Sequence, residues 1–209
     1  KAPDRAAWLN YVRAHDHIGW GLADADVRHV GHDPHDTRRF CADFFAGDHP
    51  DSYAEGYYFQ VDEATGEART SGTTAALAGL QRAQIEGPPE AIDDAIRRIL
   101  MMHSIVFATK GIPLIYSGDE IGQLNDVSYL IEPLKANDNR WVHRPPMDWD
   151  KAAQHHVDGS VEQRLFRGLQ QLAKARTSSP VLHGGSPERV HCTSNDALFV
   201  LERGDGSNG

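Results

Sequence analysis

The sequence predicts an α/β fold in which short parallel strands alternate with amphipathic helices. A β-prone run within Tyr11–Asp16 ends in an adjacent His-Asp pair, and α/β barrels place catalytic carboxylates at the carboxyl ends of buried strands. A stripe of apolar residues at helical spacing extends from Ile92 to Val106. Ile112–Ser117 then forms a continuous apolar run, which is typical of a parallel strand covered on both faces.

Composition sets the limits of what the chain can be. Its 209 residues, 40% of them hydrophobic, suffice for one large domain with a core. The formal net charge of −9 disfavours nucleic acid and anionic membranes as partners, and no apolar run approaches the length of a membrane span. Cys41 and Cys192 lie far apart, so we expect reduced thiols and a cytoplasmic location, with one disulfide as an open alternative. The chain begins with Lys1 and shows no signal peptide, so we interpret it as part of a longer protein.

Histidine is abundant, at 12 residues, and two groups of it invite a metal-binding hypothesis. The members of these groups are His29, His32, His35, His155 and His156. Asp33 and Pro34 interrupt any helix that would align the first group, so we expect a polar, solvated loop and neither a metal nor another cofactor. A structural zinc site is the alternative, which metal analysis of the purified protein would decide.

After the first strand, the sequence predicts a long irregular segment from Gly21 to about Gly72. Within it we expect an amphipathic helix at Thr37–Phe45. We also expect a hairpin in which Tyr57–Val61 pairs with a return strand across Asp62–Gly66. A connection of this length inside a compact domain is usually functional or a small inserted domain.

Regular structure is predicted to resume with a short helix at Ala75–Ala83, capped from within Ser71–Thr74. Pro88-Pro89 then marks the start of the apolar-striped helix. His103 lies on this stripe and is expected to be a hydrogen-bonded core residue. Lys110-Gly111 is expected to end the helix, because glycine suits the left-handed position after a helix.

A polar loop over residues 118–159 follows the second strand. Ser160 and Gln163 form a capping box for the next helix. Val190–Thr193 and Leu198–Glu202 look like two strands of a further β-domain.

Two motifs resemble the α-amylase superfamily of glycoside hydrolases. They are YVRAHD at Tyr11–Asp16 and GIPLIYSGDEIG at Gly111–Gly122. Further motifs resemble the amylosucrases within that superfamily. These are HDHIGW at His15–Trp20, DTRRF at Asp36–Phe40 with GEARTSGT at Gly66–Thr73, and NDNRWVHRP at Asn137–Pro145. The resemblance extends from about Leu9 to Pro180, in the same order and with similar spacing.

The resemblance implies the C-terminal part of a (β/α)₈ TIM barrel that contains its strands 7 and 8. Residues 1–16 and 75–178 would supply these strands and their helices, with a long loop after strand 8. Residues 17–74 would form a domain inserted after strand 7, and residues 181–209 would start a C-terminal β-sandwich. The N-terminal half of the same barrel is therefore an expected partner.

The same resemblance implies retaining transglycosylation. A carboxylate nucleophile attacks the anomeric carbon of sucrose while a second carboxyl protonates the departing fructose, and the glucosyl group passes to an α-1,4-glucan or to water. The family places both carboxyls N-terminal to this segment, so these 209 residues alone should be inactive. Asp16 would be the third carboxylate, which binds glucosyl hydroxyls and favours the cationic transition state.

Other residues match sugar-binding positions of the family. His15 would donate a hydrogen bond to the glucosyl ring, and Arg140 would line the glucosyl pocket, where its planar fork can hold a carboxylate and a hydroxyl together. Arg69 would lie at the fructosyl or acceptor site. Arg38 and Gln60 would hold a bound glucan.

His17 departs from the family, which usually has a second aspartate at this position on the leaving-group side. Exchanging an anion for an imidazole changes hydrogen-bond polarity and charge, so a hydrolase acting on sucrose or another α-glucoside is an alternative. A non-catalytic carbohydrate-binding module built on Arg38, Gln60 and Tyr57–Phe59 is the other alternative. The Asp119-Glu120 pair is expected to be structural rather than catalytic.

Overall fold

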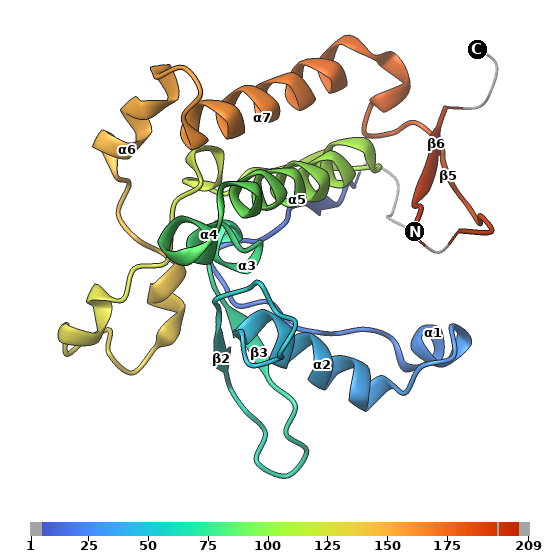
Figure 1. The fold of residues 1–209 in the computed structure, drawn as a ribbon. Helices are drawn as coiled ribbons and strands as arrows, with labels where there is room; N and C mark the ends of the chain where they lie inside the picture. Colours follow the sequence, from blue (N-terminus) through green and yellow to red (C-terminus); the bar gives the residue numbers. More distant parts are fainter. Residues whose placement is uncertain (1–5, 196, 205–209) are drawn as a thin grey trace.

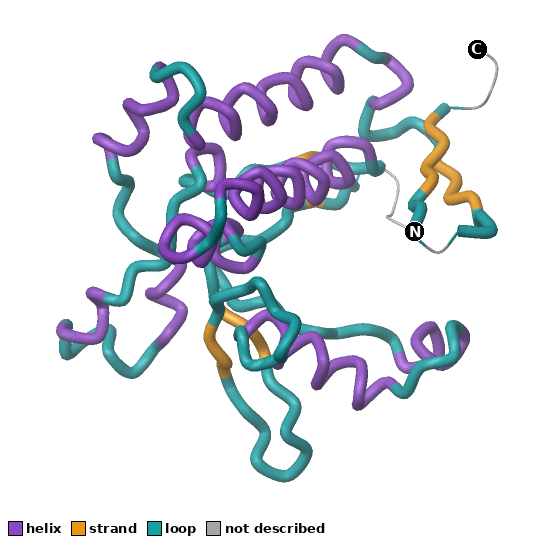
Figure 2. Tube along the Cα trace, in the orientation of Figure 1, coloured by secondary structure: helices purple, strands orange, loops and turns teal. Residues whose placement is uncertain are grey.

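The computed structural model describes residues 6–195 and 197–204 and shows a mixed α/β chain (Figure 1). Its α-helices there are α1 Asp24–His29, α2 Pro34–Ala46, α3 Thr74–Leu77, α4 Leu80–Glu86, α5 Pro89–Ala108, α6 Trp149–Ala153 and α7 Val161–Ser178. Its strands are β1 Leu9–Asn10, β2 Tyr57–Phe59, β3 Arg69–Ser71, β4 Ile112–Pro113, β5 Glu188–His191 and β6 Val200–Arg203. Five short 3₁₀ helices complete the described part: η1 Asp119–Ile121, η2 Ser128–Ile131, η3 Asn139–His143, η4 Gln154–His156 and η5 Pro180–Leu182. Figure 2 shows how small the share of strand is.

The core forms where α3, α4, α5 and α7 meet. Its fully buried members are Ala75, Ala78, Leu80, Ala95, Ile96, Ile99 and Leu165. In Figure 1, α5 and α7 lie side by side above α3 and α4. Gly168 brings α5 and α7 close together, because a Cβ there would lie 2.6 Å from the Leu100 side chain. Truncating a buried leucine or isoleucine typically costs about 2–5 kcal/mol, so these residues account for much of the stability of this layer.

Sequence signals predicted three helices well. The helix expected at Thr37–Phe45 is α2, but it begins three residues earlier than predicted. Asp33 and Pro34, which we expected to interrupt a helix, are its N-cap and first residue, so the expected loop is wrong for His35. Asp33 accepts hydrogen bonds from the backbone N–H groups of His35 and Asp36, and Gly47 ends the helix at a φ of 97°. Ser160 caps α7 by accepting from the backbone N–H of Gln163 at 3.0 Å. The Gln163 side chain reaches back to the N–H of Gly159, one residue before the cap. The apolar-striped helix is also confirmed, as α5.

Two expected helix details are wrong. The helix predicted at Ala75–Ala83 is divided into α3 and α4, because Gly79 takes a left-handed φ of 86° between them. The α5 helix ends at Ala108 with Thr109 extended, so Lys110-Gly111 does not form its left-handed end. Gly111 does take a positive φ, of 122°, but in the turn that leads into β4. His103 is a buried core residue, as expected, and its Nδ1 lies 2.8 Å from the carbonyl oxygen of Ile99.

The expected parallel pairing is confirmed, although both strands are shorter than predicted. β1 and β4 pair in parallel with Leu9 opposite Ile112. β1 ends before Tyr11, so the His-Asp pair lies in the turn beyond the strand, and the Ile112–Ser117 run is strand only at its start. The expectation of burial on both faces is wrong, because Leu9 is 56% and Ile112 53% exposed. The described residues contain three two-stranded sheets and close no barrel.

The segment over residues 17–74 contains α1, α2 and the predicted hairpin. β2 and β3 pair antiparallel with Phe59 opposite Arg69, and an additional bridge joins Ile18 to Thr70. At the other end of the chain, β5 and β6 form a second antiparallel pair close to the predicted positions. Cys41 and Cys192 are free thiols. None of the described helices is long and apolar enough to cross a membrane.

Candidate functional site

The turn after β1 that carries Asp16 is anchored on both sides. Before it, Arg13 is buried and donates from Nε to Oδ1 of Asp119 at 2.8 Å and from Nη1 to the carbonyl of His143 at 2.9 Å. The carbonyl of His15 lies 3.2 Å from Nε2 of His143 and accepts a hydrogen bond from Arg144. Asp119 therefore has a structural role, as expected from the sequence, because it binds Arg13 in the segment between β1 and the turn.

Arg140 joins the Asp16 turn to the loop that contains η3. Its guanidinium binds Asp138 through two bonds, from Nε to Oδ1 and from Nη2 to Oδ2, each at 2.8 Å. Its third arm, Nη1, lies 3.2 Å from Oδ1 of Asp16. These ionised contacts lower the pKa of Asp138 and raise that of Arg140. The arginine is thus fixed between two carboxylates that lie far apart in the sequence.

His17 joins the same turn to the β2–β3 hairpin. The antiparallel bridge between Ile18 and Thr70 makes His17 and Arg69 diagonal neighbours on one face, with His17 Nε2 2.7 Å from Arg69 Nη1. Arg69 Nη1 also donates to Oε1 of Gln60 at 2.8 Å. The structure therefore brings five sequence-predicted site residues into one cluster, which we call the Asp16 cluster. Its members are Asp16, His17, Gln60, Arg69 and Arg140.

The electrostatics of the Asp16 cluster set two protonation states. The backbone N–H of His17 and the Arg140 guanidinium lower the pKa of the half-exposed Asp16 carboxyl, so it is ionised at neutral pH. Burial lowers the pKa of His17, and Arg69 and Arg140 lower it further against the attraction of Asp16. At neutral pH the cluster thus holds an anion at Asp16 and an uncharged imidazole at His17.

Two predicted residues lie outside these contacts. The side chain of His15 is exposed and makes no hydrogen bond within the described chain; its backbone carbonyl carries the contacts. Arg38 binds Glu67 at 3.1 Å and Asp24 at 2.9 Å, so its guanidinium is neutralised by two carboxylates. Arg38 still shares with Gln60 and Arg69 the wall of a cavity of about 390 Å³.

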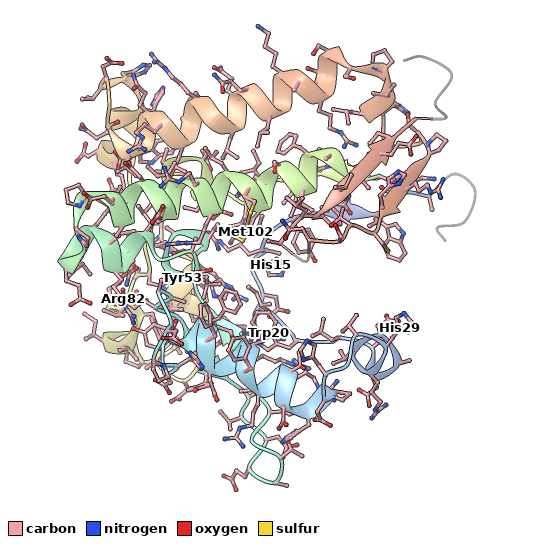
Figure 3. All side chains as sticks on the ribbon, turned by 45° about the vertical axis from the view of Figure 1, so that its right-hand side comes forward. His15, Trp20, His29, Tyr53, Arg82 and Met102 are labelled. Carbon is pink, nitrogen blue, oxygen red and sulfur yellow. The ribbon has the colours of Figure 1, made fainter. Side chains whose placement is uncertain are left out.

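Two further cavities lie in this region, and only the first of them is lined by residues of the Asp16 cluster. One, of about 520 Å³, is lined by Tyr58, Phe59, Gln60, Asn137, Asp138, Asn139 and Arg140. It combines aromatic surface with hydrogen-bond donors and acceptors, a mixture that suits a ligand rich in hydroxyl groups. The other, of about 220 Å³, is apolar, and Figure 3 shows Trp20, Tyr53 and Met102 of its wall around one opening with His15 beside it.

Sequence reasoning did not single out Asp138 or His143, and it considered Phe59 only as one of the aromatic residues of a carbohydrate-binding module. Asp138 lies two residues before Arg140, so a search for acids next to the arginine would have found it. Phe59 stacks on His17, with 4.8 Å between ring centres, and Arg140 lies over the ring at 5.2 Å from its centre. His143 is fully buried, and burial lowers its pKa to about 4. No local signal marks His143, because its partners lie elsewhere in the chain.

The histidine groups do not assemble into a metal site. Within residues 6–195 and 197–204, no cluster of three or more histidine, cysteine, aspartate or glutamate side chains has the geometry to hold a metal ion. His35 instead lies 3.1 Å from Glu67, beside Arg38. The rings of His155 and His156 lie against each other with 3.7 Å between their centres and a tilt of 42°. No protein-family model matches the chain.

Proposed function

We propose that this chain is the C-terminal part of an amylosucrase-like retaining α-glucosyltransferase, which cleaves sucrose, releases fructose and transfers glucose to an α-1,4-glucan. One observation carries the proposal. Asp16, Arg69 and Arg140 belong to three separate motifs that resemble that family, and they converge in one cluster bordered by hydroxyl-compatible cavities. If each motif only stabilised its own segment, we would not expect the side chains of three distant motifs to lie in one cluster.

The contacts of Asp16 suit the role of the third carboxylate. An anion lowers the barrier to an oxocarbenium-like transition state only if it is ionised and already fixed where positive charge develops. Asp16 is ionised because of the His17 backbone N–H and Arg140, and its turn is held by the contacts of Arg13 and His15. About half of the side chain is still exposed to receive a sugar hydroxyl.

The exposed faces of β1 and β4 support the barrel assignment. A two-stranded sheet is marginal alone, and apolar strands with free edges need neighbours. Leu9, Ile112 and Leu114 lie exposed on this pair and suit burial by further parallel strands. The nucleophile and the acid/base would come from those strands, in the N-terminal half of the parent barrel.

The test is fructose release from sucrose by the complete parent protein and by the isolated 209 residues. We expect turnover by the parent and none by the isolated chain. In the parent, Asp16→Asn should lose about 10²-fold or more in rate, the usual effect of removing one preorganised transition-state contact. Asp51→Asn, at an exposed position away from the cluster, serves as the matched control. Turnover by the isolated chain, or a near-normal rate in Asp16→Asn, would contradict the proposal.

Two alternatives follow from the same site. Glucose instead of glucan alongside fructose would identify the parent as a hydrolase. The cavity of about 520 Å³ beside Phe59 and Arg140 favours a second candidate, a carbohydrate-binding module without catalysis. A parent that binds α-glucan but leaves sucrose intact would establish this second candidate.

A further inference from the structure

We propose that His17 is a positioning residue for Arg69. Its uncharged imidazole, with the proton on Nδ1, and the side-chain carbonyl of Gln60 hold the guanidinium in place, and proton uptake by His17 releases it. We call His17, Gln60 and Arg69 the neutral clamp. The clamp stands on its own contacts, whereas the sugar that Arg69 would bind rests on the proposed function.

The contact between His17 and Arg69 determines which ring nitrogen carries the proton. Arg69 Nη1 lies 2.7 Å from His17 Nε2. A guanidinium has only donors and stays protonated in proteins, so Nε2 must be the acceptor and carry no proton. An uncharged imidazole then carries its proton on Nδ1. Nδ1 is 2.9 Å from Oδ1 of Asp16 without an aligned hydrogen bond, so the carboxylate favours the same tautomer through its charge.

Gln60 and Phe59 complete the clamp from the hairpin side. Gln60 Oε1 accepts from the same Nη1 atom at 2.8 Å, so two uncharged acceptors share one arm of Arg69. Among the described residues, Gln60 is the one non-glycine residue with a positive φ, of 51°. Such a conformation is strained for a residue that carries a side chain, and it persists where surrounding contacts compensate the strain. Phe59 stacks on the imidazole with 22° between the ring planes, which limits rotation of His17.

The charged groups around His17 give the clamp its response to pH. They are Asp16 on its own segment, Arg69 on the hairpin and Arg140 on the η3 loop, with Asp138 behind Arg140; Phe59 and Gln60 are uncharged. Burial and the two arginines keep the pKa of His17 below its ordinary value, so the clamp is closed at neutral pH. A second ring proton, on Nε2, would face the N–H of Arg69 and place two positive charges in contact. Acidification through the pKa of His17 should therefore separate the two side chains.

The clamp leaves the rest of Arg69 available to a ligand. No carboxylate in the described part of the chain forms an ion pair with Arg69, and its Nε and Nη2 atoms have no hydrogen-bond partner there. Arg69 also lines the cavity of about 390 Å³. An aspartate at position 17 would neutralise this cation, whereas His17 orients it and leaves its charge intact. We infer that the ligand presents an oxygen acceptor to Arg69.

Nuclear magnetic resonance of the ¹⁵N-labelled 209-residue chain tests the clamp directly. We expect the Nδ1–H tautomer of His17 at neutral pH. Arg69→Gln should raise the pKa of His17, because it removes a positive charge and frees Nε2 to take a proton. Arg39→Gln, at an exposed arginine of α2, is the matched control and should leave this pKa unchanged. An Nε2–H tautomer, or the same His17 pKa in Arg69→Gln and wild type, would overturn the proposal.

A second measurement separates the clamp from the proposed function. Affinity for maltoheptaose is measured between pH 5 and 8 for wild type and for His17→Gln, whose side-chain carbonyl is an acceptor that does not titrate. We expect wild type to lose about tenfold in affinity once His17 is protonated, the usual effect of losing a hydrogen bond to a charged group. His17→Gln should show no such loss. If maltoheptaose binds neither protein while the tautomer and pKa results hold, the glucan ligand is wrong and the clamp stands. Equal pH dependence in both proteins would contradict the clamp.

Discussion

Asp119→Ala should destabilise the chain by about 3–5 kcal/mol, because it removes one partner of a buried ion pair and leaves the other without compensation. Arg13 and Asp119 have side chains only 2% and 1% exposed, and Arg13 Nε and Nη2 both lie 2.8 Å from Oδ1 of Asp119. Oδ2 accepts from the Thr74 hydroxyl at 2.8 Å, so the carboxylate also joins α3 to the segment that follows β1. The remaining contacts of Arg13, with the carbonyl of His143 and the ring of Tyr116, do not neutralise its charge.

Urea unfolding followed by circular dichroism measures this loss. With a denaturant slope of roughly 2 kcal/mol per molar, a loss of about 4 kcal/mol lowers the unfolding midpoint by about 2 M. Asp94→Ala is the matched control, because the pair of Asp94 with Arg97 is exposed and such pairs contribute about 0–1 kcal/mol. A loss below about 1 kcal/mol in Asp119→Ala would refute the account of this pair.

A double variant tests the physical reason behind the loss. Replacing both partners, as Arg13→Met with Asp119→Leu, removes the buried charges together, and well-packed apolar pairs often equal or exceed a buried ion pair in stability. The double variant should therefore be markedly more stable than Asp119→Ala. If it is as unstable as the single variant, the uncompensated charge is not the cause.

Three further effects are expected from single positions. Gly79→Ala should lower the free energy of unfolding by about 1–2 kcal/mol, because residue 79 has a φ of 86° and the new Cβ would lie 3.0 Å from the Tyr53 ring. Thermal unfolding measures this loss, and an unchanged midpoint temperature would contradict it. The imidazole of His143 has a pKa of 6.5 in the unfolded chain and of about 4 in the folded chain. Because the unfolded chain then binds the proton more readily, the free energy of unfolding should fall by roughly 3 kcal/mol as the pH falls from 6.5 to 4. Urea unfolding at several pH values should show that the free energy of unfolding of His143→Gln depends less on pH than that of wild type. An equal pH dependence in the two proteins would show that His143 is not the cause. Ser160→Ala should lower the free energy of unfolding by about 1 kcal/mol, because it removes the acceptor that caps the Gln163 N–H. An equal loss in Ser178→Ala, at the opposite end of the same helix, would argue against capping.

Helices were the part of the fold that local sequence could predict. Ser160 was predicted to cap α7 and does so through a bond that spans three residues, so the information lies within one turn of chain. The cap that Asp33 makes on α2 is equally local, although we expected Asp33 to interrupt a helix. Strand limits were predicted less well, because a strand ends where its partner ends. β1 and β4 pair across about a hundred residues, and neither run alone shows that the pairing stops after two residues.

The candidate site shows the same division. The sequence alone singled out Asp16, Arg69 and Arg140 through their motifs, because residue type and short-range spacing survive without a structure. It could not show that Arg38 is occupied by two carboxylates. Nor could it show that Asp138 holds Arg140 against Asp16.

By itself, the sequence determined the existence of α2, α5 and α7, the hairpin, the parallel strand pair and the chemical types present at the site, whereas α1, α6 and the division between α3 and α4 were not predicted. Only the tertiary structure decided which charges neutralise one another and which remain available to a ligand. His17 is the clearest case, because its tautomer depends on Arg69, 52 residues away, and on Asp16 beside it. The physical reason is that charge and hydrogen-bond interactions depend on distance in space and on burial, which emerge only when separate segments pack together.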